Sequence, residues 1–313
     1  MSDIHHVTAI SGSASRNLEF YTRTLGLRFV KKTVNFDDPG TYHLYYGDEG
    51  GRPGTILTFF PWEHAAAGRQ GVGLTEQIAF RVPAASMGYW THRLLEKGVE
   101  HQPLEKRFDE PVLSFTDPHG MSLALVGVAH AAEPAWSNGE IPAEHSVHAF
   151  HSVTLMLESA GPTAAVLTDL FDFRETARED SLVRYEANDA APGSVVIIRE
   201  AGGFLPGRME RGSVHHVAFR ATDDAAQAAM AEKLRKTHDI EPTPQMDRNY
   251  FRSVYFREPG GVLFEIATDQ PGFAVDEPLA ALGRELKLPH FLEPRRREIE
   301  AALPLLEGTE RAA

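Results

Sequence analysis

The chain has 313 residues, which is about two domains' worth, and its 42% hydrophobic and 24% charged residues are typical of a globular protein. Its 44 acidic residues outnumber the 31 basic ones by 13, so we expect neither a nucleic-acid nor a membrane partner. The absence of cysteine excludes disulfides, thiolate chemistry and iron–sulfur clusters, and leaves His, Asp and Glu as metal ligands. The N-terminus lacks the pattern of a signal peptide, and we expect a cytoplasmic protein.

One pattern occurs four times along the chain. Each copy opens with an alternating strand segment, at Ile4–Thr8, Glu76–Phe80, His151–Leu155 and Val214–Ala218. Each strand leads to a stretch with helical apolar spacing, at 17–25, 87–97, 164–170 and 225–237, followed by Gly26, Gly98, Asp172 or Asp239. Further strand-like runs close on the turns Pro53-Gly54, His119-Gly120, Pro192-Gly193 and Gly260-Gly261. The repeated unit is therefore a βαβββ module.

Four such modules predict an α+β protein with two domains of two modules each. We place the N-terminal domain at 1–130, a linker rich in Ala, Pro and polar residues at 131–147, and the C-terminal domain at 148–270. A helical tail at 271–313 follows, with helices expected over 277–286 and 294–303.

Differences between the copies indicate where chemistry takes place, because all four copies share the packing needs of one scaffold. In the first strand, the equivalent positions hold His6, Gln77, Ser152 and His216. Four residues past the closing glycine, they hold Thr58, Ala124, Ile197 and Glu265. A carboxylate in an apolar strand is costly to bury unless a cation or a metal pairs with it. Two histidines and one carboxylate form the facial ligand set of non-haem Fe(II), and Mn(II) fits the same set.

Neighbouring side chains of a strand point to opposite faces, so only one residue of each His-His pair is expected to enter the cavity. We choose His6 and His216 as ligands. His151 precedes Ser152 in the repeat register and should face away from any equivalent site.

The modules and the motifs His-His-Val-Thr, His-His-Val-Ala-Phe and Gly-Gly-Val-Leu-Phe-Glu resemble the vicinal-oxygen-chelate superfamily, also called the glyoxalase–bleomycin resistance–dioxygenase superfamily. More narrowly, the chain resembles ring-cleaving extradiol-type dioxygenases that act on hydroquinones. The resemblance implies tandem vicinal-oxygen-chelate domains, with iron held between the first and last modules by His6, His216 and Glu265.

The resemblance also implies the reaction, in which Fe(II) binds an aromatic diol and O2 and the ring opens to an acid. It implies supporting or substrate-contacting roles for five further residues: His5, Thr8, His215, Arg248 and Tyr255. Tyr255 or a neighbouring histidine could move the phenolic proton, and Arg248 could stabilise the phenolate and the developing carboxylate.

Two other functions occur on the same scaffold, since a fold does not decide its chemistry. One is a glyoxalase-like isomerase or lyase, which would favour more carboxylate ligands and Zn or Ni. The other is a metal-free protein that only binds small molecules. The sequence leaves the substrate open between hydroquinones and catechols, and it allows a homodimer.

Overall fold

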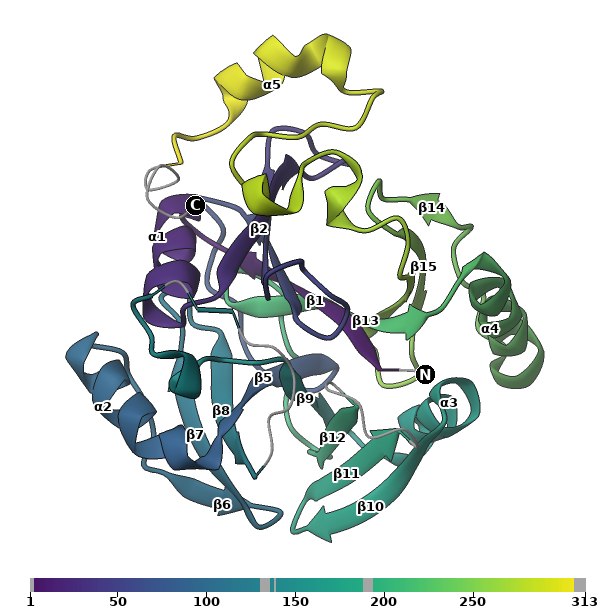
Figure 1. The fold of residues 1–313 in the computed structure, drawn as a ribbon. Coiled ribbons are helices and arrows are strands. Elements are labelled where there is room, and N and C mark those ends of the chain that lie inside the picture. The colour runs from purple at the N-terminus through teal and green to yellow at the C-terminus, as the bar shows by residue number, and fades with distance from the viewer. Residues whose placement is uncertain (1–2, 130–135, 138, 188–193, 307–313) are drawn as a thin grey trace.

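Two curled eight-stranded sheets form the centre of the computed structural model, which describes residues 3–129, 136, 137, 139–187 and 194–306 (Figure 1). The strands of the first sheet are, in spatial order, β14 (Met246–Asp247), β15 (Arg252–Arg257), β16 (Leu263–Thr268), β13 (Ser213–Ala221), β1 (Ile4–Ser11), β4 (Ile56–Pro61), β3 (Tyr42–Gly47) and β2 (Arg28–Val34). The strands of the second are β10 (Phe173–Glu179), β11 (Leu182–Ala187), β12 (Val195–Glu200), β9 (Phe150–Leu157), β5 (Leu74–Pro83), β8 (Ser122–Val128), β7 (Glu110–Thr116) and β6 (Glu105–Arg107).

The strand order shows which modules combine. The first sheet joins the first module to the fourth through the antiparallel pair β1 and β13, and the second sheet joins the second module to the third through β5 and β9. Each sheet therefore takes strands from both sides of the expected linker. The boundaries 1–130, 131–147 and 148–270 remain a prediction about the order of the modules in the sequence.

Each module carries one helix, which lies outside the sheets (Figure 1). The helices are α1 (Ala14–Glu19), which continues as a π-helix over Phe20–Thr24, α2 (Met87–Glu96), α3 (Gly161–Phe171) and α4 (Asp224–His238). The side chain of Asp223 caps α4 by accepting a hydrogen bond from the amide of Ala226 at 2.8 Å. The residues predicted to follow the helices all have left-handed backbones, with φ of 74° at Gly26, 64° at Gly98, 57° at Asp172 and 54° at Asp239.

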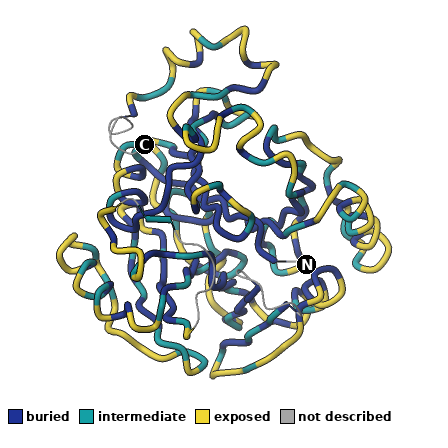
Figure 2. Tube along the Cα trace, viewed as in Figure 1, coloured by how far each residue is buried: buried dark blue, intermediate teal, exposed yellow. Residues whose placement is uncertain are grey.

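The core consists of the apolar side chains of the central strands. Both sheets contribute to one continuous cluster that includes Val7, Phe80, Phe150 and Phe219, each at most 1% exposed. The outer faces of the helices remain exposed (Figure 2). The predicted α+β modules are thus confirmed, and the pairing of the modules places β1, β13 and β16 side by side.

The tail differs from the expectation for residues 277–286. This segment is not a helix. It contains only the 3₁₀ turn Leu279–Ala281, after a similar turn at Phe273–Val275. Two features prevent a helix: Gly283 has φ of 79° against the backbone of Phe29, and the carboxylate of Glu277 is drawn inward to Lys31. The second tail helix is confirmed as α5 (Arg296–Ala302), which follows the 3₁₀ turn Glu293–Arg295.

Two further 3₁₀ turns lie at Ala84–Ser86 and Ala143–His145. The expected turn Pro192-Gly193 and most of the first half of the expected linker lie outside the described residues. Within the described ranges, every helix is too short or too polar to cross a bilayer.

Candidate metal centre

Three buried side chains from three adjacent strands meet in the first sheet. His6 comes from β1, His216 from β13 and Glu265 from β16, and one potential ligand atom from each lies within 4.8 Å of the other two. The Oε2 atom of Glu265 is 2.9 Å from Nε2 of His216 and 3.3 Å from Nε2 of His6. The register explains the convergence, because Ala218 pairs with both His6 and Glu265 and thereby sets the three side chains on one face.

The surroundings of Glu265 fit a bound cation. The residue is 0% exposed, and its Oε1 atom accepts a hydrogen bond from the hydroxyl of Ser253 at 2.5 Å. Its Oε2 atom is buried with no hydrogen-bond donor assigned to it among the described residues. Burial opposes the ionised form, but His6 and His216 hold the pKa of Glu265 well below its usual range. An ionised, inward-facing oxygen beside two imidazole nitrogens is the donor set of a divalent transition-metal site.

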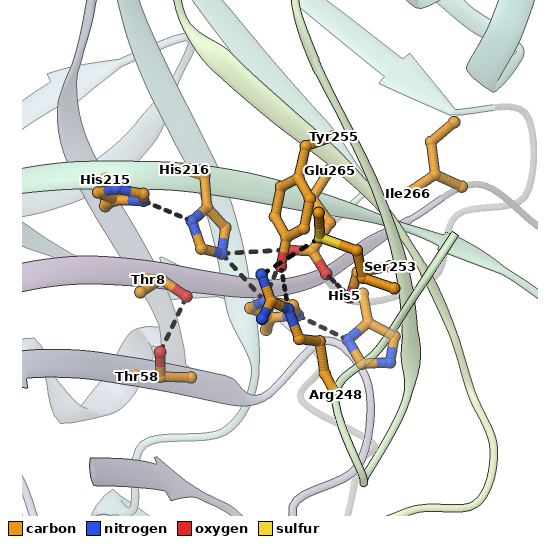
Figure 3. Close-up of polar contacts among 12 residues, drawn as sticks. His5, Thr8, Thr58, His215, His216, Arg248, Ser253, Tyr255, Glu265 and Ile266 are labelled. Carbon is orange, nitrogen blue, oxygen red and sulfur yellow. Dashed lines mark hydrogen bonds and ion pairs between the residues drawn. The ribbon is translucent and has the colours of Figure 1, made fainter. Parts of the chain in front are cut away.

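Each of these two histidines contacts the histidine that precedes it. Nδ1 of His6 lies 2.9 Å from Nδ1 of His5, and Nδ1 of His216 lies 2.8 Å from Nδ1 of His215 (Figure 3). Burial lowers the pKa of His5 and of His215 to about 3, so both rings are neutral at pH 7. A neutral ring can accept a hydrogen bond from the Nδ1–H of its neighbour, which leaves the Nε2 lone pair of His6 or His216 free for a metal.

His5 and His215 differ in their relation to the cavity. Each contacts the following histidine ring to ring, and His215 also lines the cavity, whereas His5 is not among its lining residues. The expectation that neither points at the metal position stays a prediction. His5 is itself buried, at 2% exposed, as are all the residues of β1.

A cavity of about 360 Å³ opens beside the three residues, a size suited to a small ligand. His6 and His216 are part of its wall, and the other lining residues are mostly aromatic or polar: Asn35, Phe36, Asp37, His43, Tyr45, Phe60, Trp62, His215, Thr243, Met246, Arg248, Phe251, Tyr255 and Leu263.

Arg248 and Tyr255 lie together in this wall. Nε of Arg248 donates to the hydroxyl of Tyr255 at 3.3 Å, and a terminal nitrogen of Arg248 pairs with Asp37 at 3.1 Å. Burial and the nearby Glu265 carboxylate raise the pKa of Tyr255 well above its usual value, so the phenol is protonated at neutral pH. The pair thus presents one fixed positive charge and one phenolic hydroxyl to the cavity.

Thr8, like His5, is buried and is not part of the cavity wall. Its hydroxyl accepts a hydrogen bond from Thr58 at 2.8 Å. Thr8 is therefore connected to the site through Thr58 and not by contact with a ligand in the cavity.

The second sheet has no equivalent cluster among its described residues. At the positions equivalent to His6 and His216 it has Gln77, which donates to Ser114 and Ser122, and Ser152, whose hydroxyl lies 3.0 Å from Nδ1 of His151. His151 contacts Glu110 at 3.2 Å, and the expectation that it faces away from a metal position stays a prediction.

The sequence of this chain matches proteins of one family. The model of the Glyoxalase/Bleomycin resistance protein/Dioxygenase superfamily matches residues 3–125. A Bacillus subtilis relative named "Putative ring-cleaving dioxygenase MhqO" is 43% identical over 96% of this chain and 95% of its own length. A relative from Sphingobium indicum, named chlorohydroquinone/hydroquinone 1,2-dioxygenase, is 31% identical over 93% of this chain and 92% of its own length.

The chain belongs to this superfamily, among its ring-cleaving dioxygenases. A Bacillus subtilis crystal structure described as a "putative dioxygenase" aligns with a TM-score of 0.93 at 42% identity, over 97% of each chain. Glyoxalase I from Zea mays aligns with a TM-score of 0.64 at 13% identity, over 86% of this chain and 93% of its own, and shares the fold. The expected resemblance and the tandem vicinal-oxygen-chelate fold are both confirmed.

Several residues of this dioxygenase site were not singled out from the sequence. They are His43, Tyr45 and Ser253, together with the aromatic wall residues Phe60, Trp62 and Phe251. Comparing the repeats at the third strand of each module could have found Tyr45. It pairs with Thr58 as Tyr255 pairs with Glu265, so the two tyrosines hold equivalent positions.

Proposed function

We propose that this ring-cleaving dioxygenase depends on Fe(II) and acts on an aromatic diol of the hydroquinone or catechol type. The observation that carries the proposal is the buried cluster of His6, His216 and Glu265 at the wall of an aromatic-lined cavity. The hydroquinone dioxygenase among the relatives supports the substrate class. Mn(II) fits the same ligand set.

His6, His216 and Glu265 would hold the metal. Fe(II) bound there would supply electron transfer between the diol and O2. The chain's own residues bind and orient the diol: the rings of Phe60 and Phe251 offer flat apolar surfaces for an aromatic ring.

Arg248 and Tyr255 stabilise the negative charges that form on the substrate and the product. The guanidinium of Arg248 stabilises a phenolate and then the carboxylate that ring opening produces, through charge-assisted hydrogen bonds. The hydroxyl of Tyr255, which accepts a hydrogen bond from Arg248 and is itself protonated, donates a hydrogen bond to the substrate phenolate. His5 and His215 keep the two ligand imidazoles in one tautomer by accepting from their Nδ1–H groups.

O2 uptake tests this function directly. The purified protein is loaded anaerobically with Fe(II) and then mixed with O2 and hydroquinone, methylhydroquinone or catechol, while ultraviolet spectra follow the ring-opened product. We expect uptake that equals product formed, and at least a 1,000-fold loss in the Glu265→Gln variant, since the variant lacks the anionic ligand.

The matched control is Glu110→Gln, because Glu110 is a carboxylate paired with a histidine in the second sheet. This variant should retain uptake. Absence of uptake with every diol at full iron occupancy would refute the proposal. Conversion of hemithioacetals by the same preparation would then assign the site to a glyoxalase-like isomerase.

A further inference from the structure

A hydrogen-bonded chain of four side chains leads from the cavity wall into the first sheet. The hydroxyl of Tyr45 lies 2.8 Å from Nδ1 of His43, and Nε2 of His43 lies 2.8 Å from the hydroxyl of Thr58. Thr58 in turn donates to the hydroxyl of Thr8, also at 2.8 Å. Strands β3, β4 and β1 are neighbours in the sheet, which places the four side chains in sequence.

The hydrogen bonds of this chain have one consistent direction. When Thr58 donates its single proton to Thr8, it accepts from His43, and Nε2 of His43 then carries the ring proton. A neutral imidazole protonated on Nε2 has an acceptor at Nδ1. The hydroxyl of Tyr45 therefore donates to His43, and its oxygen has lone pairs left to accept a further hydrogen bond.

Tyr45 and His43 are held firmly in this arrangement. Their ring centroids are 4.1 Å apart, and the ring of Phe60 packs against His43 with centroids 4.3 Å apart. Tyr45 is 2% exposed and also contacts Phe273, with centroids 5.1 Å apart. Both Tyr45 and His43 nonetheless form part of the cavity wall. A rotation that would turn the Tyr45 proton toward the cavity would leave the buried Nδ1 of His43 without a donor.

The position of Tyr45 relates it to the substrate. It is the counterpart in the first module of Tyr255 in the fourth, and both tyrosines line the same cavity. Tyr255 is the hydrogen-bond partner of Arg248, whereas Tyr45 belongs to the neutral chain through His43. The two equivalent phenols therefore offer the cavity different chemistry, one beside a cation and one presenting an acceptor.

We propose that Tyr45, fixed by His43, accepts a hydrogen bond from the second hydroxyl of the diol and so selects a ring hydroxyl over a substituent that only accepts hydrogen bonds. The inference rests on the proposed function insofar as the ligand is an aromatic diol. It identifies the favoured substrates as those with a free second hydroxyl, such as hydroquinone, and disfavours their methyl ethers.

Anaerobic equilibrium binding tests this selection without turnover. Titration calorimetry measures the dissociation constants of hydroquinone and 4-methoxyphenol with the metal-loaded protein, and the ratio of the two constants defines the hydroxyl preference. The steric cost of the methyl group is common to all variants, so changes in the ratio report the hydrogen bond. We expect Tyr45→Phe to reduce the preference by about 3- to 10-fold, the range that one neutral hydrogen bond contributes.

A second variant tests the direction of the chain. His43→Phe removes the acceptor for the Tyr45 proton, so the Tyr45 hydroxyl becomes free to donate into the cavity. This variant should bind 4-methoxyphenol more tightly than the wild type does. Tyr46→Phe is the matched control, because Tyr46 is the next residue on β3 and its hydroxyl donates to Asn17, away from the cavity. The control should keep the wild-type ratio.

The inference is overturned if Tyr45→Phe, with unchanged melting temperature and metal content, keeps the wild-type ratio, or if the wild type binds neither phenol. A wild type that shows the preference but consumes no O2 would refute the dioxygenase function and leave the recognition by Tyr45 standing. If His43→Phe fails to fold, the comparison of Tyr45→Phe with Tyr46→Phe decides the question.

Discussion

His6 and His216 are 210 positions apart in the sequence, yet their Nε2 atoms lie 3.4 Å apart. They meet because β1 and β13 are adjacent in the first sheet, where the first module pairs with the last. The candidate centre is therefore assembled from both ends of the chain, and it can form only after β1 has paired with β13.

The paired histidines should tune the affinity for metal. We expect His5→Phe and His215→Phe each to raise the metal dissociation constant by about 10- to 100-fold, because each removes the acceptor that fixes the tautomer of a ligand imidazole. Titration of the metal-free protein with Fe(II) or Mn(II) in competition with a chelator measures the change.

His151→Phe is the control for both variants, since His151 holds the corresponding place beside Ser152 in the second sheet. Its metal affinity should equal that of the wild type. Equal weakening by all three variants would indicate a general loss of stability and not an effect on the ligands.

The sequence predicted much of this site because the four modules are an internal comparison. A histidine or carboxylate that occurs in some copies and is replaced by uncharged residues of other types in the rest is not explained by packing, and this singled out His6, His216 and Glu265. The pairing of modules was not derivable from the modules themselves, because every module offers a similar strand edge. Tyr45 and His43 lie in an aromatic segment whose composition predicts a buried core strand. Their polar role depends on hydrogen bonds that link β3, β4 and β1, which the sequence does not reveal.

The misassigned tail segment has a similar cause. Residues 277–286 have helical spacing, but tertiary contacts override it: Glu277 is buried against Lys31, and Gly283 takes a left-handed backbone against Phe29. Lys31 lies on β2, far away in the sequence, so nothing in the sequence of residues 277–286 indicates that Glu277 will pair with it.

Ser253 should support the carboxylate of the centre. Its hydroxyl donates to Oε1 of Glu265, and Ser253→Ala leaves that buried oxygen without this donor. We expect metal affinity to fall about 10-fold with little change in the fold. The control Ser86→Ala removes a buried hydroxyl that contacts Glu144 and His145, remote from the centre, and should leave metal affinity unchanged. Equal affinities of the two variants would exclude the role of Ser253.

Lys31 should hold the tail onto the first sheet. Its ammonium group is 0% exposed and pairs with both Asp276 and Glu277, while it also lies 4.9 Å from the ring centroid of Tyr250. We expect Lys31→Met to reduce the free energy of unfolding by about 3–5 kcal/mol, because it leaves the buried carboxylate of Glu277 and the partly buried carboxylate of Asp276 without this cation. Urea denaturation measures the loss, and limited proteolysis should cut first within the tail.

Two further variants separate the charge effect from packing. Adding Asp276→Asn and Glu277→Gln to Lys31→Met removes the uncompensated charges and should recover part of the loss. Lys287→Met breaks a pair with Glu285, whose side chain is 74% exposed, and should cost much less than Lys31→Met. No recovery in the triple variant would mean that the lysine acts through its aliphatic stem alone.

His119 should make the fold sensitive to mild acid. Burial, with help from the cations Arg16 and Arg211, lowers the pKa of His119 to about 4 from a usual value of 6.5. Between these two pH values the unfolded chain binds a proton that the folded chain does not, so the free energy of unfolding falls as the pH drops below 6.5. Above pH 7 both states are neutral at this residue and the contribution vanishes.

The variant His119→Phe keeps an aromatic ring in the same place. It removes no hydrogen bond at Nε2, because that atom is buried without a hydrogen-bond partner among the described residues. Urea unfolding of both proteins at pH 7.5, 6 and 5 isolates the effect of the proton. Between pH 7.5 and 5, the free energy of unfolding should fall by about 2 kcal/mol more in the wild type than in the variant. Parallel pH profiles would contradict this prediction. They would show that His119 takes up its proton in the folded protein as readily as in the unfolded chain, and that burial does not lower its pKa.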